Sequence, residues 1–188
     1  MDALISTFLS VLLAEMGDRT QILAAALAIR YRHDKTVLVG MSLATLANCA
    51  ISAMGGSVID AWISEAPVKL FAAMAYVFAG VGMLLWRRPV DILENWKTPP
   101  FLTAFLGLFI LEFGDKSQFI IAAQSARYDY WFMVGIGGFA AIMAAVVPAA
   151  LLGARLSDIL PLRAIRLGGG IVLTLLGIIL GLQAFGLV

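Results

Sequence analysis

Six long apolar stretches constrain the fold of this chain more than any other feature. They cover residues 4–29, 37–61, 68–86, 101–126, 131–154 and 165–187, and each is long enough to cross a bilayer as a helix, some with tilt. The apolar residues run continuously and do not alternate with polar ones, which argues against the strands of a membrane barrel. With 62% hydrophobic and only 13% charged residues, the chain has too little charge for a soluble domain. We therefore expect an all-α, polytopic membrane protein with six transmembrane helices.

Two of these stretches contain the same charged motif. Residues 15–20 read Glu-Met-Gly-Asp-Arg-Thr, residues 112–117 read Glu-Phe-Gly-Asp-Lys-Ser, and a glutamine follows each, at Gln21 and Gln118. A carboxylate near the centre of a bilayer costs roughly 3 kcal/mol on insertion scales, so four of them cost on the order of 10 kcal/mol unless they are compensated. Ionisable residues in such positions are interpreted first as a functional site.

The similarity between the two halves extends beyond the motifs. A shift of 97 residues aligns Glu15 with Glu112 and Asp18 with Asp115, and it also aligns Arg30-Tyr31 with Arg127-Tyr128, Gly40 with Gly137, Gly56 with Gly153 and Gly80 with Gly177. This pattern indicates an internal duplication. Each copy has three spans, an odd number, so the second copy must enter the membrane upside down, as in the inverted repeats of secondary transporters. We expect three-helix repeats over 1–87 and 101–188, joined by a cytoplasmic linker over 88–100.

Basic residues predict the topology. The connections after the first, third and fifth spans hold Arg30, Arg32, Lys35, Arg87, Arg88, Lys97, Arg155, Arg163 and Arg166, whereas the other side holds only Lys69 and Arg127. The positive-inside rule places the basic side in the cytoplasm and both termini outside it. The first stretch is interpreted as a retained span, because Asp2 stands where a cleaved leader has a basic start. The longest connection is either a short helix on the membrane surface or a plain linker.

The motifs supply an oxygen-only set of candidate metal ligands. On a continuous helix, the Glu, Asp and Gln of each motif are three residues apart and share one broad face. If the repeats pack about an axis in the membrane plane, the two faces meet near the bilayer centre. The candidate ligands are Glu15, Asp18, Gln21, Glu112, Asp115 and Gln118, and the accessory or gating residues are Arg19, Thr20, Asn48, Lys116 and Ser117.

These donors favour a hard divalent cation. Mg²⁺, Ca²⁺ and Mn²⁺ fit oxygen ligands, whereas zinc and copper are poorly matched without His or Cys. The one cysteine, Cys49, is expected to pack within a span, and it excludes an internal disulfide. The four acids and two basic residues of the motifs sum to a formal charge of −2, which one divalent cation neutralises. Protons could take the place of the metal, so exchange of a divalent cation for protons is the hypothesis, with no prosthetic group.

Purely structural interpretations compete with this one. Glu15 with Arg19, and Glu112 with Lys116, are spaced i,i+4, which is the spacing of a local ion pair that only stabilises its helix. The duplication, with an additional aspartate in each copy, favours a site instead. Gly17 and Gly114 would permit either close helix packing or local unwinding, and packing is the role we expect.

The pattern Glu-x-Gly-Asp-(Lys/Arg)-(Thr/Ser), present twice in a chain of six spans, resembles the signature of the Gdt-type manganese/calcium transporter family. That family includes Golgi cation transporters and bacterial manganese exporters. The resemblance covers both halves of the chain, and the family's motif acids map onto Glu15, Asp18, Glu112 and Asp115. It implies export of Mn²⁺ as the first choice and transport of Ca²⁺ as the second, against protons, in a bacterial inner membrane. The implied partners are the metal ion, protons and the lipid bilayer, and no nucleic acid. Assembly into a homo-oligomer is left open.

Two other functions are weighed against a carrier. The Gly-Asp in each motif is similar to part of the Gly-x-Gly-Asp motif of intramembrane aspartyl proteases. Two near-identical motifs do not supply the unequal environments that a two-aspartate site needs, and Glu15 stands where the leading glycine should be. A passive cation channel needs weak binding at several sites and an open path, whereas a compact set of acids favours an occluded carrier. We therefore expect no enzyme.

Overall fold

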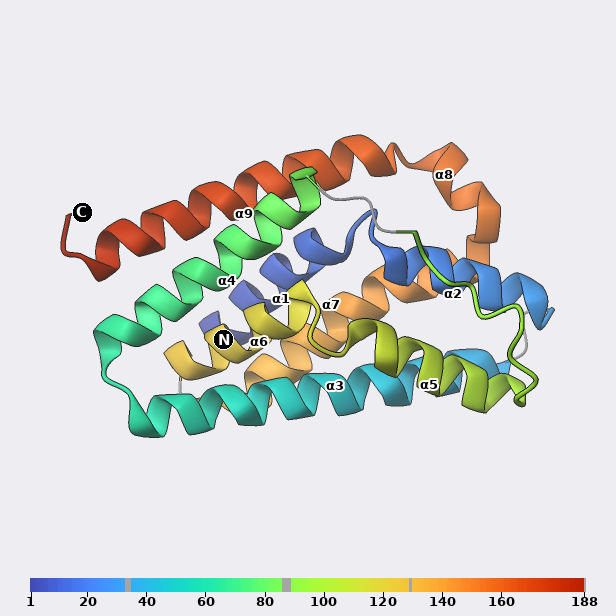
Figure 1. Ribbon diagram of the computed structural model, residues 1–188, viewed down its shortest axis with the longest axis horizontal. Helices are drawn as coiled ribbons and strands as arrows, with labels where there is room; N and C mark the ends of the chain where they lie inside the picture. The colour runs from blue at the N-terminus through green and yellow to red at the C-terminus, as the bar shows by residue number, and fades with distance from the viewer. Residues whose placement is uncertain (33–34, 86–88, 129, 188) are drawn as a thin grey trace.

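The computed structural model describes residues 1–32, 35–85, 89–128 and 130–187, and all regular structure within these ranges is helical. The helices are α1 (Asp2–Glu15), α2 (Arg19–Arg30), α3 (Lys35–Trp62), α4 (Glu65–Leu85), α5 (Pro100–Glu112), α6 (Lys116–Tyr128), α7 (Trp131–Leu152), the 3₁₀ turn η1 (Gly153–Arg155), α8 (Leu156–Ile159) and α9 (Leu162–Ala184) (Figure 1). The all-α prediction is confirmed. The repeat boundaries predicted at 87 and 88 lie outside the described residues.

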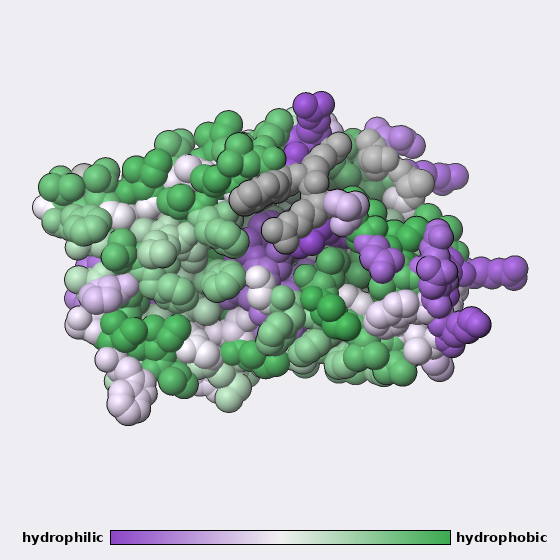
Figure 2. Space-filling view, in the orientation of Figure 1, coloured by the Kyte–Doolittle hydropathy of each residue, from purple (hydrophilic) through white to green (hydrophobic). Residues whose placement is uncertain are grey.

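Four helices, α3, α4, α7 and α9, are long and apolar enough to cross a membrane. They coincide with the predicted spans over 37–61, 68–86, 131–154 and 165–187. Figure 2 shows hydrophobic side chains over most of the visible face and hydrophilic ones gathered toward the end where α2 ends and α5 begins. The continuous helices predicted over 4–29 and 101–126 are wrong, because each of these stretches is divided at its motif into two shorter helices.

The two breaks have the same local cause. Gly17 has φ +78° and Gly114 has φ +74°, a left-handed conformation that L-residues avoid and glycine adopts readily. The main-chain N–H of each glycine leaves the helical pattern and donates to the side-chain oxygen of the glutamine four residues on, at 2.8 Å for Gln21 and 3.1 Å for Gln118. The glycines therefore unwind the chain at both motifs. The close packing expected from the sequence is present at Gly17, where an added Cβ would lie 2.6 Å from the carbonyl oxygen of Leu162, but not at Gly114, where no atom of the described residues lies within 4 Å of an added Cβ.

The helices of the second half repeat those of the first. Helices α1 to α4 correspond to α5, α6, α7 and α9 at the offset of 97 residues. Equivalent packing contacts recur as well: a Cβ added at Gly40 of α3 would lie 2.6 Å from the carbonyl oxygen of Phe101, and one added at Gly137 of α7 would lie 2.6 Å from that of Leu4. Helix α3 therefore packs on α5 as α7 packs on α1.

Helices α4 and α9 lie side by side and join the two halves (Figure 1). A Cβ added at Gly80 would lie 2.6 Å from the carbonyl oxygen of Gly170, and one added at Gly177 would lie 2.8 Å from that of Ala73. The absence of side chains at these positions lets the two backbones approach closely, which is how membrane helices gain packing energy without a hydrophobic driving force between them.

The two halves differ at one pair of equivalent contacts. A Cβ added at Gly56 of α3 would lie 2.1 Å from the carbonyl oxygen of Ala122 in α6. Its counterpart Gly153 follows α7 with φ +55°, and the counterpart of Ala122, Ala25 in α2, lines a cavity together with Gly153. One half is therefore tightly packed on the facing helix at this position, whereas a cavity adjoins the equivalent position of the other half.

Replacing Gly56 with Ala tests this contact. We expect Gly56→Ala to lower the free energy of unfolding by about 1–3 kcal/mol, the usual cost of overpacking, because the added methyl has to displace α6. The neighbouring Gly55 has no atom within 4 Å of an added Cβ, so Gly55→Ala should be neutral or stabilise the helix by up to about 1 kcal/mol. Thermal unfolding of the two variants in detergent compares them, and equal losses would contradict the close contact.

The connection over residues 89–99 contains no helix, so the short surface helix considered from the sequence is wrong and the plain linker is confirmed for those residues. Arg30, at the end of α2, donates hydrogen bonds to the carbonyl oxygens of Leu93 and Trp96. Leu93 is buried and its side chain contacts Gly107 of α5. The linker is therefore fixed to both α2 and α5.

Candidate metal centre at the two helix breaks

The two breaks meet in the structure and exchange charged side chains. Arg19, the first residue of α2, donates to the carboxylate of Asp115 at 3.1 Å. In the reverse direction Lys116, the first residue of α6, donates to the carboxylate of Asp18. Each basic residue of a motif therefore binds the aspartate of the other motif, which holds the two breaks against each other.

This arrangement contradicts the local ion pairs considered from the sequence. Among the ion pairs of the described residues, none joins Glu15 to Arg19 or Glu112 to Lys116. The i,i+4 geometry requires a continuous helix, and both helices end at the glutamate. The basic side chains consequently belong to the next helix and reach across to the other half.

Three carboxylates converge on one point. Glu15, Glu112 and Asp115 each offer one oxygen, and these oxygens all lie within 4.8 Å of one another. The glutamates are fully buried, with 0% and 1% of their surface exposed. Acids this close in a region without water repel one another, and a positive charge between them removes the repulsion. The position favours a bound cation.

The two glutamates have different hydrogen-bond partners. Glu112 accepts hydrogen bonds from the hydroxyl of Thr20 and, at 3.2 Å, from that of Ser117. Within the described part of the chain, neither carboxylate oxygen of Glu15 accepts a hydrogen bond, and its basic partner is the ammonium of Lys116 at 3.9 Å. A buried carboxylate without hydrogen bonds is costly, so Glu15 is the group whose requirement for a cation is least satisfied.

The amide side chains predicted as ligands have other partners. The side-chain carbonyl oxygens of Gln21 and Gln118 accept hydrogen bonds from the main-chain N–H groups of the glycines at the breaks. Each of these oxygens therefore has only its second lone pair left for a metal ion. Asn48 donates to the carbonyl oxygen of Phe109, one turn before Glu112, at 3.2 Å. Its own side-chain oxygen is buried and accepts no hydrogen bond, so Asn48 has a free oxygen beside α5.

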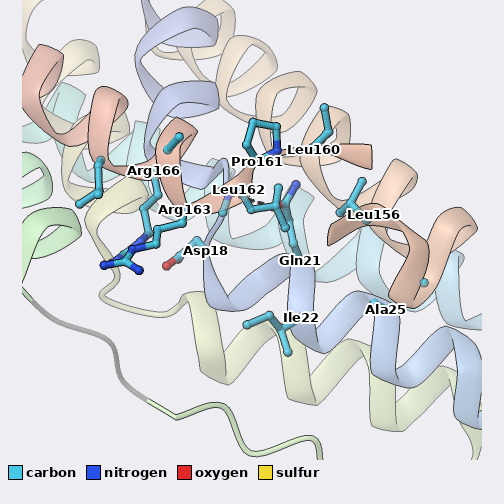
Figure 3. A pocket seen from close by; sticks show the side chains of 14 residues that line it. Asp18, Gln21, Ile22, Ala25, Leu156, Leu160, Pro161, Leu162, Arg163 and Arg166 are labelled. Carbon is cyan, nitrogen blue, oxygen red and sulfur yellow. Dashed lines mark hydrogen bonds between the residues drawn. The ribbon is translucent and has the colours of Figure 1, made fainter. Parts of the chain in front are cut away.

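A cavity of about 780 Å³ lies next to the first break, between α2 and the segment from η1 to α9. Its lining combines the first motif with apolar and basic side chains: Gly17, Asp18, Gln21, Ile22, Ala25, Gly153, Leu156, Leu160, Pro161, Leu162, Arg163, Ala164, Arg166 and Leu167. In Figure 3, Asp18 and Gln21 face Leu162 and Arg166 across this space. Asp18 therefore joins the cavity wall to the buried acids through its ion pair with Lys116.

Some residues near the site were not singled out from the sequence. Arg163 and Arg166 line the cavity only because α9 is folded back over the first break. On the other side of the breaks, the hydroxyl of Tyr76 lies 2.6 Å from that of Ser10 and accepts from Gln124 at 2.8 Å. These three side chains are buried and link α1, α4 and α6. Polar residues within apolar spans are visible in the sequence, and this feature could have marked them as candidates.

Comparison with known proteins matches both halves of the chain to one family. The model of the family described as divalent cation/proton antiporter GDT1 matches residues 3–89 and 100–187, and each segment contains one motif. A Vibrio cholerae protein named as a candidate manganese exporter is 34% identical over 168 residues, which is 88% of this chain and 84% of that protein. No solved structure matches the chain.

Eukaryotic relatives share a smaller part of their length. The Arabidopsis thaliana GDT1-like protein 3 is 30% identical over 84% of this chain and 64% of its own length. The divalent cation/proton antiporter GDT1 of Saccharomyces cerevisiae is 29% identical over 57% of this chain and 38% of its own length. The family model covers both halves of the chain, and the chain therefore belongs to the GDT1 family of divalent cation/proton antiporters, a family of membrane transporters and not of enzymes.

Proposed function

We propose that this chain exports Mn²⁺ from the cytoplasm in exchange for protons, with Ca²⁺ as the second substrate. The observation that carries the proposal is the meeting of Glu15, Glu112 and Asp115 within 4.8 Å, at the point where both helices are broken. Of these acids, Glu15 accepts no hydrogen bond, which leaves its oxygens available to a metal ion.

The donors at this point determine the class of substrate. They are carboxylates, with hydroxyl and amide oxygens nearby, and Cys49 is the only cysteine in the chain. Oxygen donors bind Mn²⁺ and Ca²⁺ better than they bind softer metals. The choice of Mn²⁺ over Ca²⁺ follows the name of the Vibrio cholerae relative. Asp18, Gln21, Gln118 and Asn48 are proposed to complete the coordination as the ion enters or leaves.

Six spans arranged as two inverted repeats are part of the proposal. The broken pairs α1–α2 and α5–α6 would then each count as one span, and the breaks would lie midway across the bilayer. Discontinuous helices in this position are where secondary transporters bind their ions. The equivalent contacts at Gly40 and Gly137 support a two-fold relation between the halves.

The cavity next to α2 is the proposed entry path from the cytoplasm. It is lined by Arg163 and Arg166, which belong to the basic side of the chain, and the positive-inside rule assigns this side to the cytoplasm. At the equivalent position in the other half, Gly56 packs directly against Ala122. Access from one side and closure on the other are what an exporter needs when it loads its ion, and both termini would then lie outside the cytoplasm.

The alternatives have less support. In an aspartyl protease two acids must activate a water molecule, whereas Asp18 and Asp115 are each bound to a basic side chain. A passive channel needs a continuous open path. The ammonium of Lys116 lies between the cavity-lining Asp18 and the buried Glu15, and Arg19 is paired with Asp115, which favours a carrier with an occluded site.

Proton coupling is tested with vesicles that contain the purified protein and Mn²⁺. We expect acidification of the outer solution to accelerate the release of Mn²⁺, because protons that enter down their gradient replace the metal on the acids. Collapse of the pH gradient with nigericin should slow release to the rate at equal pH. Release that ignores the gradient would argue against antiport, and competition by Ca²⁺ measures the order of preference between the two metals.

A further inference from the structure

The ammonium of Lys116 occupies the position of a cation within the group of acids. Its Nζ atom contacts Asp18, lies 3.1 Å from Asp115 and lies 3.9 Å from Glu15. Two of these partners, Glu15 and Asp115, belong to the set of three carboxylates that converge within 4.8 Å. A metal ion bound to that set would therefore come close to the ammonium, and two positive charges repel strongly where water is scarce.

The equivalent residue of the other half does not take this position. Arg19 contacts Asp115 alone among the four motif acids, and 24% of its side chain is exposed, compared with 9% for Lys116. The two residues correspond at the offset of 97 and make one reciprocal bond each. Lys116 also contacts the glutamate of the other motif and the aspartate of its own motif, Glu15 and Asp115, and Arg19 has no equivalent of these two contacts among the ion pairs of the described residues.

We propose that Lys116 is a tethered competitor of the transported metal ion, and that the metal displaces its ammonium from Glu15 and Asp115. This inference rests on the proposed function and adds a role for one residue. With no metal bound, the ammonium compensates part of the charge of the acids, and protons that replace the metal compensate the rest during the return step. When the metal enters, the flexible lysine side chain retains Asp18 as its partner, on the wall of the cavity, and the released carboxylates bind the metal.

Lysine suits this role better than arginine. Its compact ammonium sits at the end of a flexible chain with three rotatable donors, so it can change partners without losing its charge. The planar guanidinium of Arg19 is better suited to a fixed ion pair. The difference between the motifs at this position therefore corresponds to a mobile cation in one half and a fixed one in the other.

The test measures binding of Mn²⁺ by the purified protein, using the electron paramagnetic resonance signal of the free ion. We expect Lys116→Gln to lower the Kd by about tenfold or more, within the usual range of coupling between two ligands of one protein. Arg19→Gln should lower it by clearly less. Lys69→Gln removes an equally charged lysine from an exposed pair with Glu65, and its Kd should equal that of the wild type.

Transport provides a readout that a structural role would not change. In vesicles, Lys116→Gln should lower the KM for Mn²⁺ and also lower kcat, because the ion is released more slowly. Lys116→Arg keeps the charge, and its Kd should stay within about threefold of the wild type, well below the coupling expected for removal of the charge.

Several results would overturn the role of Lys116. They are an unchanged or weaker Kd in Lys116→Gln, or an equal gain in Arg19→Gln. If Lys116→Gln does not fold, a second variant carries Lys116→Cys in a Cys49→Ala background. Its cysteine is modified either with a methanethiosulfonate reagent that adds an ammonium group or with one that adds only a methyl group. Equal binding of Mn²⁺ by the two products would also overturn the role of Lys116. Failure of the proposed function is separate, since the wild type itself would then bind no Mn²⁺.

Discussion

Glu15→Gln should abolish transport of Mn²⁺ by this protein. The substitution keeps the size of the side chain and removes one negative charge from the three converging acids. Loss of a charged ligand from a buried site should weaken binding by about 100-fold or more, which corresponds to about 3 kcal/mol. The measurement is uptake and efflux of Mn²⁺ in cells and in vesicles, with Asp115→Asn as a second variant for which the same loss is expected.

Glu65→Gln is the matched control for this prediction. Glu65 lies at the start of α4, is exposed, and among the described residues pairs only with Lys69, at 2.7 Å. The chemical change is the same, but transport should match that of the wild type. Equal manganese tolerance in cells that carry Glu15→Gln, Asp115→Asn and the wild type would contradict the assignment of the site.

The same variant separates function from stability. In the absence of metal, Glu15→Gln should leave the Tm unchanged or raise it, because a buried acid without hydrogen bonds is replaced by a neutral group. Mn²⁺ at 100 times its Kd should stabilise the wild type by about 2.7 kcal/mol, and this increase should be absent from the variant. A low Tm in the variant without metal would instead indicate a structural role for Glu15.

Gly17→Ala should disrupt both the fold of the first break and transport. A left-handed conformation costs an alanine about 1–2 kcal/mol, and overpacking adds about 1–3 kcal/mol. Both apply at Gly17, since its φ is +78° and an added Cβ would lie 2.6 Å from the carbonyl oxygen of Leu162 and 3.1 Å from Cβ of Arg166. We expect the free energy of unfolding to fall by about 2–5 kcal/mol, measured by thermal unfolding in detergent.

Gly114→Ala provides the comparison within the same molecule. Gly114 has a similar φ of +74°, but no atom of the residues that the structure describes lies within 4 Å of an added Cβ. Only the conformational cost of about 1–2 kcal/mol should remain. If the two variants lose the same stability, the close approach of α9 to the first break is not present in the folded protein.

The sequence by itself determined the class of fold and the identity of the charged residues. Continuous apolar stretches require helices in a membrane, and the duplicated motifs marked the acids because charges in such stretches need compensation. It did not determine the breaks at Gly17 and Gly114. A glycine that packs and a glycine that unwinds look alike in a sequence, and only the main-chain φ distinguishes them.

Tertiary structure decided which charges meet. The spacing within each motif predicted local ion pairs, whereas the folded chain pairs Arg19 with Asp115 and Lys116 with Asp18 across the two halves. It also decided that two equivalent halves differ, with Gly56 packed on α6 and its counterpart beside a cavity. The two halves have the same residue types at these positions, Gly56 and Gly153 with Ala122 and Ala25. The difference is therefore not visible in the repeat pattern, because it arises from how the helices of one half pack against those of the other.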